Sequence, residues 1–414
     1  MRRVKHARSI SLTVVLACVV GTMAVGTAMK SPCAGGNYDG RQYRLLCYSD
    51  IVPLLGTEQL QGNRLPFLDR CKETGNNCDE YPVLTMYLMR AAAWISGDHY
   101  ASFYYVNALL LTVFAAGAAV GIWMLAGRRA LWFALAPTLL IYGTINWDLF
   151  AVMLMVLALV AFAERRDGWA GALLGLGAAA KFFPAILLLP LFLQGLQDRE
   201  PDRSVRVLWW TAGTWAAVNL PFAIAAPGAW WEFFRFNGER TPDFDSLWYI
   251  ACRHEHATCI STSHVDLVSL GLFIGLIGFL LLLRLDKDRD FPRWTLGFPL
   301  LVVFLLVNKV YSPQYGLWLL PWFALATRSL RRFVLFEIAD VAVFVTRFWF
   351  FGAFTGAMTW PKQWWFEVAV LVRAAILIWC LAAWVREDAP VRALGTRGWR
   401  RARSPDETAE AIVA

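Results

Sequence analysis

One carboxylate stands out by its position in the chain. Asp50 follows the first long apolar segment, in a loop that runs from Ser31 to Glu80. A carboxylate held at a membrane surface can accept a proton from a hydroxyl group and so activate it for attack. Hydrophobic residues make up 58% of the 414 positions, so the bilayer is the solvent of most of the chain. The position of Asp50 therefore points to chemistry on a substrate that a lipid carries.

Cations within apolar segments form a second group of candidates. Lys181 separates two apolar stretches and is followed closely by Pro184, which predicts a helical hairpin with Lys181 at its tip. A lysine at membrane depth is costly unless it meets a partner, and a phosphate is a natural one. The alternative is a side chain that extends to the aqueous surface. Lys309 and Arg347 are the other cations that we expect to contact an anion.

Two further observations concern charged residues at helix starts and within segments. Asp148 stands at a predicted helix start, where it either contacts substrate or only interacts with the helix dipole. Glu337, Asp340 and Arg347 share one helical face, and Arg373 lies in the next segment. Some of these charges are expected to form ion pairs that only hold helices together.

Apolar runs near the length that crosses a bilayer recur along the chain. They predict an all-α polytopic membrane protein with about twelve membrane segments, at residues 11–29, 101–126, 130–144, 148–164, 168–180, 182–196, 207–227, 264–284, 294–308, 314–327, 333–352 and 366–386. Basic residues before the first segment place the N-terminus inside, and every later inner loop is also basic. We expect a multi-pass protein of the plasma membrane with its chemistry on the outer face.

The same pattern divides the chain. Residues 1–10 are predicted to be a cytoplasmic N-terminus, 11–388 the transmembrane domain, and 389–414 a disordered basic tail. Outer-side material concentrates in loops 30–100 and 229–264. Within the first of these, an apolar stretch from Tyr81 to Trp94 predicts a helix that lies along the interface rather than crossing the membrane.

Cysteines mark the outer loops as well. Four fall in the first outer loop and two in the second, which predicts disulfides on the oxidising side, at Cys33, Cys47, Cys71, Cys78, Cys252 and Cys259. The pairs Cys71–Cys78 and Cys252–Cys259 are favoured because each closes a small loop. A zinc site that combines the second pair with neighbouring histidines is disfavoured, since these cysteines are predicted to be oxidised. No metal and no cofactor are expected.

Several short motifs occur in a characteristic order: Tyr48-Ser49-Asp50, Glu80-Tyr81-Pro82, Asn146-Trp147-Asp148, Lys181-Phe182-Phe183-Pro184 and Ser312-Pro313-Gln314-Tyr315. In this order the chain, from about residue 11 to 386, resembles the bacterial glycosyltransferase family 87. These are polytopic enzymes of the GT-C type, similar to the polyprenyl-phosphate-mannose-dependent α-mannosyltransferases of actinobacterial envelope synthesis.

The resemblance implies a polyprenyl-phosphate sugar donor, a glycolipid or glycan acceptor on the outer face, and inversion at the anomeric carbon. It assigns the catalytic carboxylate to the first outer loop, where Asp50 is preferred over the alternatives Asp39, Asp69, Asp79 and Glu80. Positive charge beside the departing phosphate falls to Lys181, Lys309 and Arg347. The remaining candidates for substrate contacts are Tyr48, Glu80, Tyr81, Asp148, Gln314 and Tyr315. The cysteines of the first loop have no place in the family pattern.

The charge distribution and the motifs also bear on other functions. The net charge of +8 concentrates on inner loops and the tail, so it indicates contact with membrane lipids rather than nucleic acid. No glycine-rich nucleotide loop is present, which disfavours the use of ATP or nucleotide sugars. A lipid or sugar transporter or flippase is the alternative, because it would also bury charges in broken helices. A non-catalytic partner in envelope synthesis is a third reading.

Overall fold

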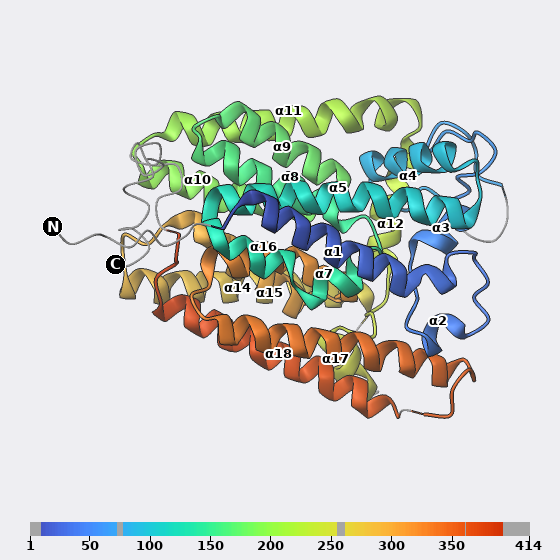
Figure 1. Ribbon diagram of the computed structural model, residues 1–414. Coiled ribbons are helices and arrows are strands. Elements are labelled where there is room, and N and C mark those ends of the chain that lie inside the picture. Colours follow the sequence, from blue (N-terminus) through green and yellow to red (C-terminus); the bar gives the residue numbers. More distant parts are fainter. Residues whose placement is uncertain (1–9, 73–77, 255–260, 361, 392–414) are drawn as a thin grey trace.

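The computed structural model describes residues 10–72, 78–254, 261–360 and 362–391. Within these ranges the regular structure is entirely helical, and most long helices run roughly along one axis (Figure 1). In the first half of the chain the helices are α1 (Leu12–Lys30), α2 (Arg41–Arg44), α3 (Ile51–Thr57), α4 (Val83–Ser96), α5 (Tyr100–Ala126), α6 (Ala130–Ala134), α7 (Pro137–Tyr142), α8 (Asp148–Ala163), α9 (Asp167–Ala180) and α10 (Leu188–Gln197).

The second half contributes the remaining helices. They are α11 (Pro201–Ala225), α12 (Pro227–Glu239), α13 (Leu247–His254), α14 (Thr262–Lys287), α15 (Gly297–Val307), α16 (Gly316–Ala326), α17 (Leu330–Phe354) and α18 (Gln363–Arg386). Short 3-10 turns precede several of them: η3 (Phe183–Leu187) before α10, η4 (Arg293–Leu296) before α15 and η5 (Pro313–Tyr315) before α16.

Each predicted membrane segment coincides with one helix or with two consecutive helical elements. The segment 130–144 is split into α6 and α7 because Pro137 cannot donate a hydrogen bond within a continuing helix. By length and composition, four stretches in the described residues can cross a membrane: Leu12–Cys33, Tyr100–Ala134, Thr262–Lys287 and Gln363–Arg386. The all-helical membrane architecture is confirmed, whereas the count of twelve crossings stays a prediction.

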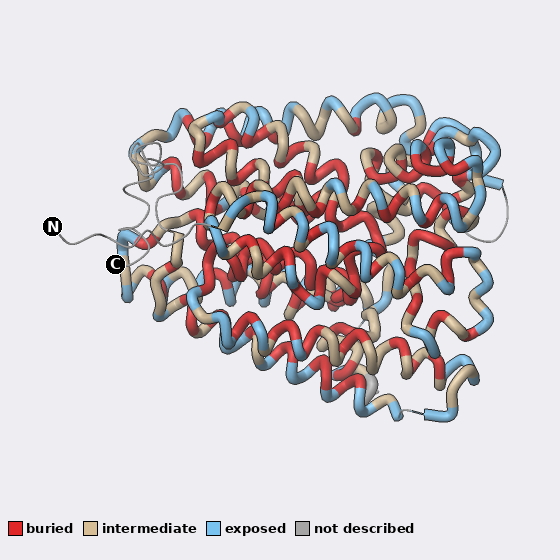
Figure 2. Tube along the Cα trace, viewed as in Figure 1, coloured by how far each residue is buried: buried red, intermediate tan, exposed pale blue. Residues whose placement is uncertain are grey.

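The lateral surface of the bundle, along the sides of its helices, is apolar, as contact with lipid requires. Leu109 on α5, Ile224 on α11 and Leu267 on α14 are each more than 65% exposed. Buried residues concentrate where helices face one another (Figure 2). A soluble protein would rarely expose so many large apolar side chains along several helices.

The bundle has two distinct ends. We call the end where α1 begins and α18 ends the basal end, and the opposite end the apical end (Figure 1). The apical end carries residues 31–82 and the turns at 143–147 and 308–312. The expected second outer loop, 229–264, is partly helical instead, because α12 and α13 form within it.

Close helix packing sets the position of α9. A Cβ atom at Gly175 would lie 2.6 Å from the carbonyl oxygen of Thr211, and one at Gly171 would overlap the backbone of α11 as well. Only glycine at these positions lets the two backbones approach so closely. The packing holds α9 against α11 along its length, which fixes the apical tip where α9 ends.

Buried polar contacts inside the bundle connect its helices. Asp340 on α17 accepts a hydrogen bond from Arg373 on α18 at 2.9 Å, and both side chains are fully buried. Glu337 accepts a hydrogen bond from the backbone N–H of Thr138 at 2.8 Å. These are ion pairs and hydrogen bonds of the structural kind that the sequence predicts within the segments.

Two disulfides lie in the first loop. The structure joins Cys33 to Cys47 and Cys71 to Cys78. The expected Cys252–Cys259 pair involves Cys259, which lies outside the described residues. The predicted interfacial helix at 81–94 corresponds to α4, whose position relative to a membrane remains a prediction.

Candidate active site

The loop that carries Asp50 is fixed by its backbone. Ser49 Oγ donates a hydrogen bond to the carbonyl of Thr144 at 2.7 Å, and the Ile51 N–H donates to the carbonyl of Ile145 at 3.2 Å. Tyr38 donates from its hydroxyl to the Ser49 carbonyl at 2.7 Å. The loop therefore docks on the turn between α7 and α8, although nearly a hundred residues separate them in sequence.

The carboxylate of Asp50 is held by side chains rather than by its own helix. Asp50 precedes α3 at the N-cap position but makes no capping hydrogen bond. Instead Asn146 Nδ2 donates to Asp50 Oδ2 at 3.0 Å and to the Tyr81 hydroxyl at 2.9 Å, and the Tyr48 hydroxyl also hydrogen-bonds Asp50.

Burial raises the pKa of Asp50 above its usual 3.8. The hydrogen bonds from Asn146 and Tyr48 oppose this rise, as do the positive charges of Lys181 and Arg347. A carboxylate with a raised pKa is a better proton acceptor than an ordinary aspartate. The buried position of Asp50 therefore suits a role as a general base.

Replacing Asn146 with Ala is expected to move the acid limb of the activity profile to higher pH. The Asn146 hydrogen bond stabilises the charged form of Asp50, so its loss raises the pKa further. Activity that needs deprotonated Asp50 is then lost at a higher pH as the solution is acidified. Transfer rates measured across pH test this, with the exposed Asn237→Ala as control; an unmoved acid limb would separate Asn146 from the Asp50 titration.

Lys181 sits where α9 breaks, and the sequence explains the break. Pro184 has no N–H to donate to the carbonyl of Ala180, as a continuing helix would require. That carbonyl instead accepts a hydrogen bond from Thr85 Oγ1 at 2.6 Å. Lys181 adopts an extended conformation, with φ −158° and ψ 132°, and the chain then returns through η3 and α10. This is the hairpin that the sequence predicts.

The Lys181 ammonium is paired with a buried carboxylate. It lies 2.8 Å from Asp148 Oδ1, which also accepts a hydrogen bond from Trp318 Nε1 at 2.6 Å. Its charge faces the rings of Tyr315 and Trp318, which stack on each other with centroids 4.0 Å apart. Lys181 therefore meets a partner rather than reaching out to solvent, and Asp148 does more than cap its helix.

The other two predicted cations also have carboxylate partners. Arg347 pairs with Asp243 at 3.6 Å and with Asp245. Lys309 pairs with Asp266 at 2.8 Å and donates to the Gly238 carbonyl at the same distance. Arg347 is close enough to Asp50 to lower its pKa, whereas the contacts of Lys309 are with α12 and α14.

The remaining predicted substrate residues lie near either Asp50 or Lys181, with one exception. Tyr48 hydrogen-bonds Asp50, Tyr81 hydrogen-bonds Asn146 beside it, and the ring of Tyr315 faces the Lys181 ammonium. Gln314 is buried beside Tyr315, and Glu80 interacts with the charges of the region around α12 instead. The structure thus brings residues from all five motifs together around Asp50 and Lys181.

Two residues of this region escaped the sequence analysis as functional candidates. Lys30, at the end of α1, is 1% exposed and donates from Nζ to the Tyr48 carbonyl at 3.1 Å. Asn146 was noted only as part of a motif, yet its amide binds Asp50 directly. The available signal for Lys30 was a lysine at the apical end of an otherwise uncharged segment.

Beyond Asp50, α3 ends at a second unusual carboxyl group. Glu58 Oε2 accepts hydrogen bonds from the backbone N–H groups of Asp79 at 2.7 Å and Glu80 at 3.3 Å. Burial, together with the negative charge of Glu80, raises the pKa of Glu58 from 4.5 to about 8. Glu58 therefore fastens the far end of the first loop to α3.

The Glu58→Gln variant is expected to melt at a higher temperature than the parent at alkaline pH. The folded chain holds the Glu58 proton up to about pH 8, whereas the unfolded chain releases it near pH 4.5, so rising pH destabilises the fold across this window. Glutamine removes this penalty, and the difference should vanish below that window. Melting curves across pH, with the exposed Glu239→Gln as control, test this; a pH-independent difference would contradict it.

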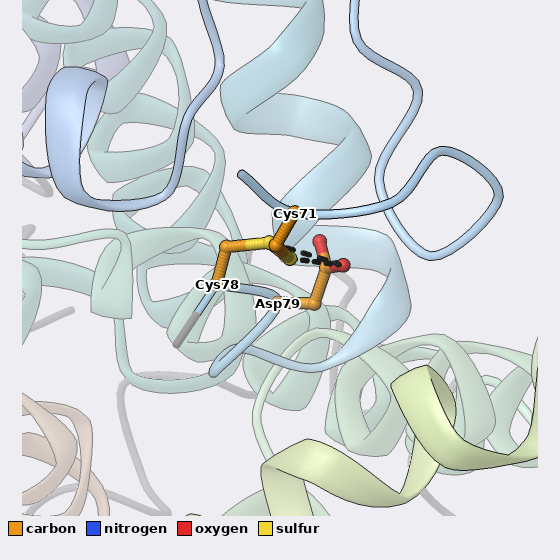
Figure 3. A group of neighbouring side chains, drawn as sticks. All are labelled: Cys71, Cys78 and Asp79. Carbon is orange, nitrogen blue, oxygen red and sulfur yellow. Dashed lines mark hydrogen bonds between the residues drawn. A yellow bond between two sulfur atoms is a disulfide. The ribbon is translucent and has the colours of Figure 1, made fainter. Parts of the chain in front are cut away.

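Among the described residues, one group could by composition hold a metal ion: Cys71, Cys78 and Asp79 (Figure 3). Its two sulfur atoms are joined in a disulfide, so they offer no thiolates. Asp79 instead accepts a hydrogen bond from Arg64 Nη2 at 2.7 Å. The group is a structural staple. Part of the histidine-containing segment considered for zinc, residues 255–260, lies outside the described residues.

The chain is similar in structure to known membrane proteins. Two similar solved structures are an oligosaccharyltransferase of Archaeoglobus fulgidus, 13% identical with a TM-score of 0.40, and ArnT from Cupriavidus metallidurans bound to undecaprenyl phosphate, 12% identical with a TM-score of 0.46. The chain is covered over 96% and 91% of its length, and it spans 59% and 77% of theirs. No curated protein matches the sequence.

A family model matches a large part of the chain. The model of glycosyltransferase family 87 covers residues 81–308, more than half of the sequence. The match includes Tyr81, the Asn146-Trp147-Asp148 turn and Lys181, while Asp50 and the 312–315 motif lie outside it. The resemblance noted in the sequence is thereby confirmed, and this membrane protein belongs to glycosyltransferase family 87.

Proposed function

We propose that this glycosyltransferase moves a sugar, mannose, from a polyprenyl-phosphate donor to a glycolipid or glycan acceptor on the outer face of the plasma membrane. The observation that carries the proposal is the meeting of two groups at the apical end. One is a carboxylate with a raised pKa, Asp50, and the other is the cation Lys181, whose charge acts on that carboxylate.

The proposed reaction inverts the anomeric carbon in one displacement. The acceptor oxygen forms a bond to the anomeric carbon while the bond from that carbon to the phosphate oxygen breaks. Asp50 accepts the proton of the acceptor hydroxyl as the attack develops. The polyprenyl phosphate leaves with the bonding electrons, and its growing negative charge faces Lys181. A phosphate needs no proton to leave, so no general acid is required.

Asp148 takes a different part from the direct substrate contact that its motif suggested. Its side chain is fully buried, and its Oδ1 atom is occupied by Lys181 and Trp318. We assign it the role of orienting the Lys181 ammonium. Such a partner, at 2.8 Å, holds the ammonium group in place before the donor binds.

Arg347 and Lys309 support the phosphate less directly. Two carboxylates already surround Arg347, and Asp266 neutralises Lys309. Either cation would have to leave its partner to bind a phosphate directly. In the proposal Lys181 therefore makes the main contact with the donor phosphate, whereas Arg347 acts through the effect of its positive charge on Asp50.

A narrow apolar pocket lies beside Tyr81, and its lining includes Phe67, Phe182, Trp215 and Trp230. Its volume of about 10 Å³ cannot enclose an isoprenoid chain. In the proposal the hydrocarbon tail of the donor therefore packs against this aromatic wall, next to Tyr81 and Phe182.

The proposal is tested by transfer from a defined donor. Purified protein is incubated with a synthetic polyprenyl-phosphate [¹⁴C]mannose and membrane glycolipids, and labelled glycolipid is separated by chromatography. We expect label to reach the glycolipid from this donor and not from a nucleotide-activated mannose. Donor movement between leaflets of a vesicle without any transfer would instead favour the transporter.

A further inference from the structure

A second cavity opens at the basal end, far from Asp50. It holds about 500 Å³ between the start of α9 and the first turns of α11, and it is lined by Arg165, Arg166, Asp167, Gly168, Trp169 and Arg206. Since the proposed transfer takes place at the apical end, none of these residues has a part in it.

The lining of this cavity carries surplus positive charge. Its one carboxylate, Asp167, is buried and already bonded to Arg203 at 3.0 Å from behind the wall. Arg206 reaches the same carboxylate at 3.3 Å but keeps 59% of its side chain exposed. Among the described residues no carboxylate pairs with Arg166, which is also exposed. Two guanidinium groups therefore face the opening with little or no compensation.

Exposed indoles lie next to these arginines, one step toward the middle of the bundle. Trp169 is 67% exposed, while Trp209 and Trp210 on α11 are 70% and 55% exposed. Trp210 follows Arg206 by four residues, a rise of about 6 Å along the helix. The arginines thus lie at the start of the helix, and the tryptophans lie one turn closer to the middle of the bundle. A membrane leaflet has the same order, with phosphates outermost and the upper ends of the acyl chains below them.

We propose that this cavity binds the headgroup of an anionic phospholipid from the leaflet at the basal end. The planar guanidinium groups of Arg166 and Arg206 bind phosphate oxygens in a forked geometry. The exposed indoles beside them contact the upper part of the acyl chains. These apolar neighbours favour a lipid over free phosphate, which would leave the tryptophans without a partner.

Native mass spectrometry of the purified full chain tests this, with phosphatidylglycerol and phosphatidylcholine offered together in micelles. The parent is expected to retain phosphatidylglycerol in preference. The Arg166→Gln/Arg206→Gln variant should retain it more than tenfold less tightly, because each cation near a membrane surface contributes about fivefold. The control is Arg289→Gln/Arg331→Gln, which removes two exposed arginines from the same end but outside the cavity.

Three results would overturn the assignment. Equal losses in both double variants would show attraction by net charge alone. Equal retention of phosphatidylcholine would show no preference for an anionic headgroup. Displacement of the lipid by inorganic phosphate at matched concentration would show a free-phosphate site. Circular dichroism of each variant establishes that the helices are intact.

Discussion

The Asp50→Asn variant is expected to remain folded and to lose sugar transfer, with kcat lower by about 10²- to 10⁴-fold. Asparagine keeps the size of the side chain but cannot accept the acceptor's proton. The loop stays in place, because its hydrogen bonds to Thr144 and Ile145 come from Ser49 and from the backbone of Ile51. Initial rates with the polyprenyl-phosphate sugar donor measure the effect.

Asp39→Asn provides the matched control for this experiment. Asp39 lies in the same loop, is about half exposed and, within the part of the chain that the structure describes, pairs with Arg41 alone, at 3.0 Å. It should transfer sugar at the parental rate. Undiminished transfer by Asp50→Asn, with the fold intact, would remove Asp50 from the mechanism.

The second large effect concerns Lys181 and its partner. Lys181→Met alone leaves the buried Asp148 charge without compensation, which is expected to cost about 3 kcal/mol of stability. The double variant Asp148→Asn/Lys181→Met removes both charges together and should regain most of this loss. Its affinity for polyprenyl phosphate should still fall by tenfold or more, because the charge-assisted contact to the phosphate is gone.

A second buried pair separates donor binding from general damage. Asp340→Asn/Arg373→Met removes an ion pair of 2.9 Å between α17 and α18 that is buried more deeply than the first, since Lys181 is 18% exposed and Arg373 only 1%. Thermal melts compare stabilities, and titration with radiolabelled polyprenyl phosphate compares affinities. If the Asp148/Lys181 double variant binds polyprenyl phosphate as tightly as the parent, Lys181 serves only to neutralise Asp148.

Much of the architecture follows from the sequence because apolar runs and breaker residues act locally. Pro184 lies beside the predicted break between segments 168–180 and 182–196, because it cannot donate a hydrogen bond within a helix. Pro137 acts in the same way, although the segment 130–144 that it splits was predicted as one. The hairpin at Lys181 could be predicted for the same reason. Membrane crossing is harder to count, because helices such as α16 are short and buried within the bundle.

The site could be predicted only in part, because its contacts join residues far apart in sequence. The motifs named Asp50, Lys181 and Asp148, but nothing in the sequence shows that Asp148 would meet Lys181 rather than a substrate. The partners of Arg347 could not be predicted for a related reason, because Asp243 and Asp245 lie in the segment 229–264, which the sequence predicts to be a loop. Lys30 went unnoticed since its contact is a backbone carbonyl.

The most direct test of the central claim is an experimental structure with bound polyprenyl phosphate. We expect the phosphate within contact of the Lys181 ammonium, the isoprenoid against the aromatic wall beside Tyr81, and Asp50 across the space that a sugar would fill. A phosphate bound elsewhere, with Asp50 closed off from it by protein, would exclude the proposed mechanism.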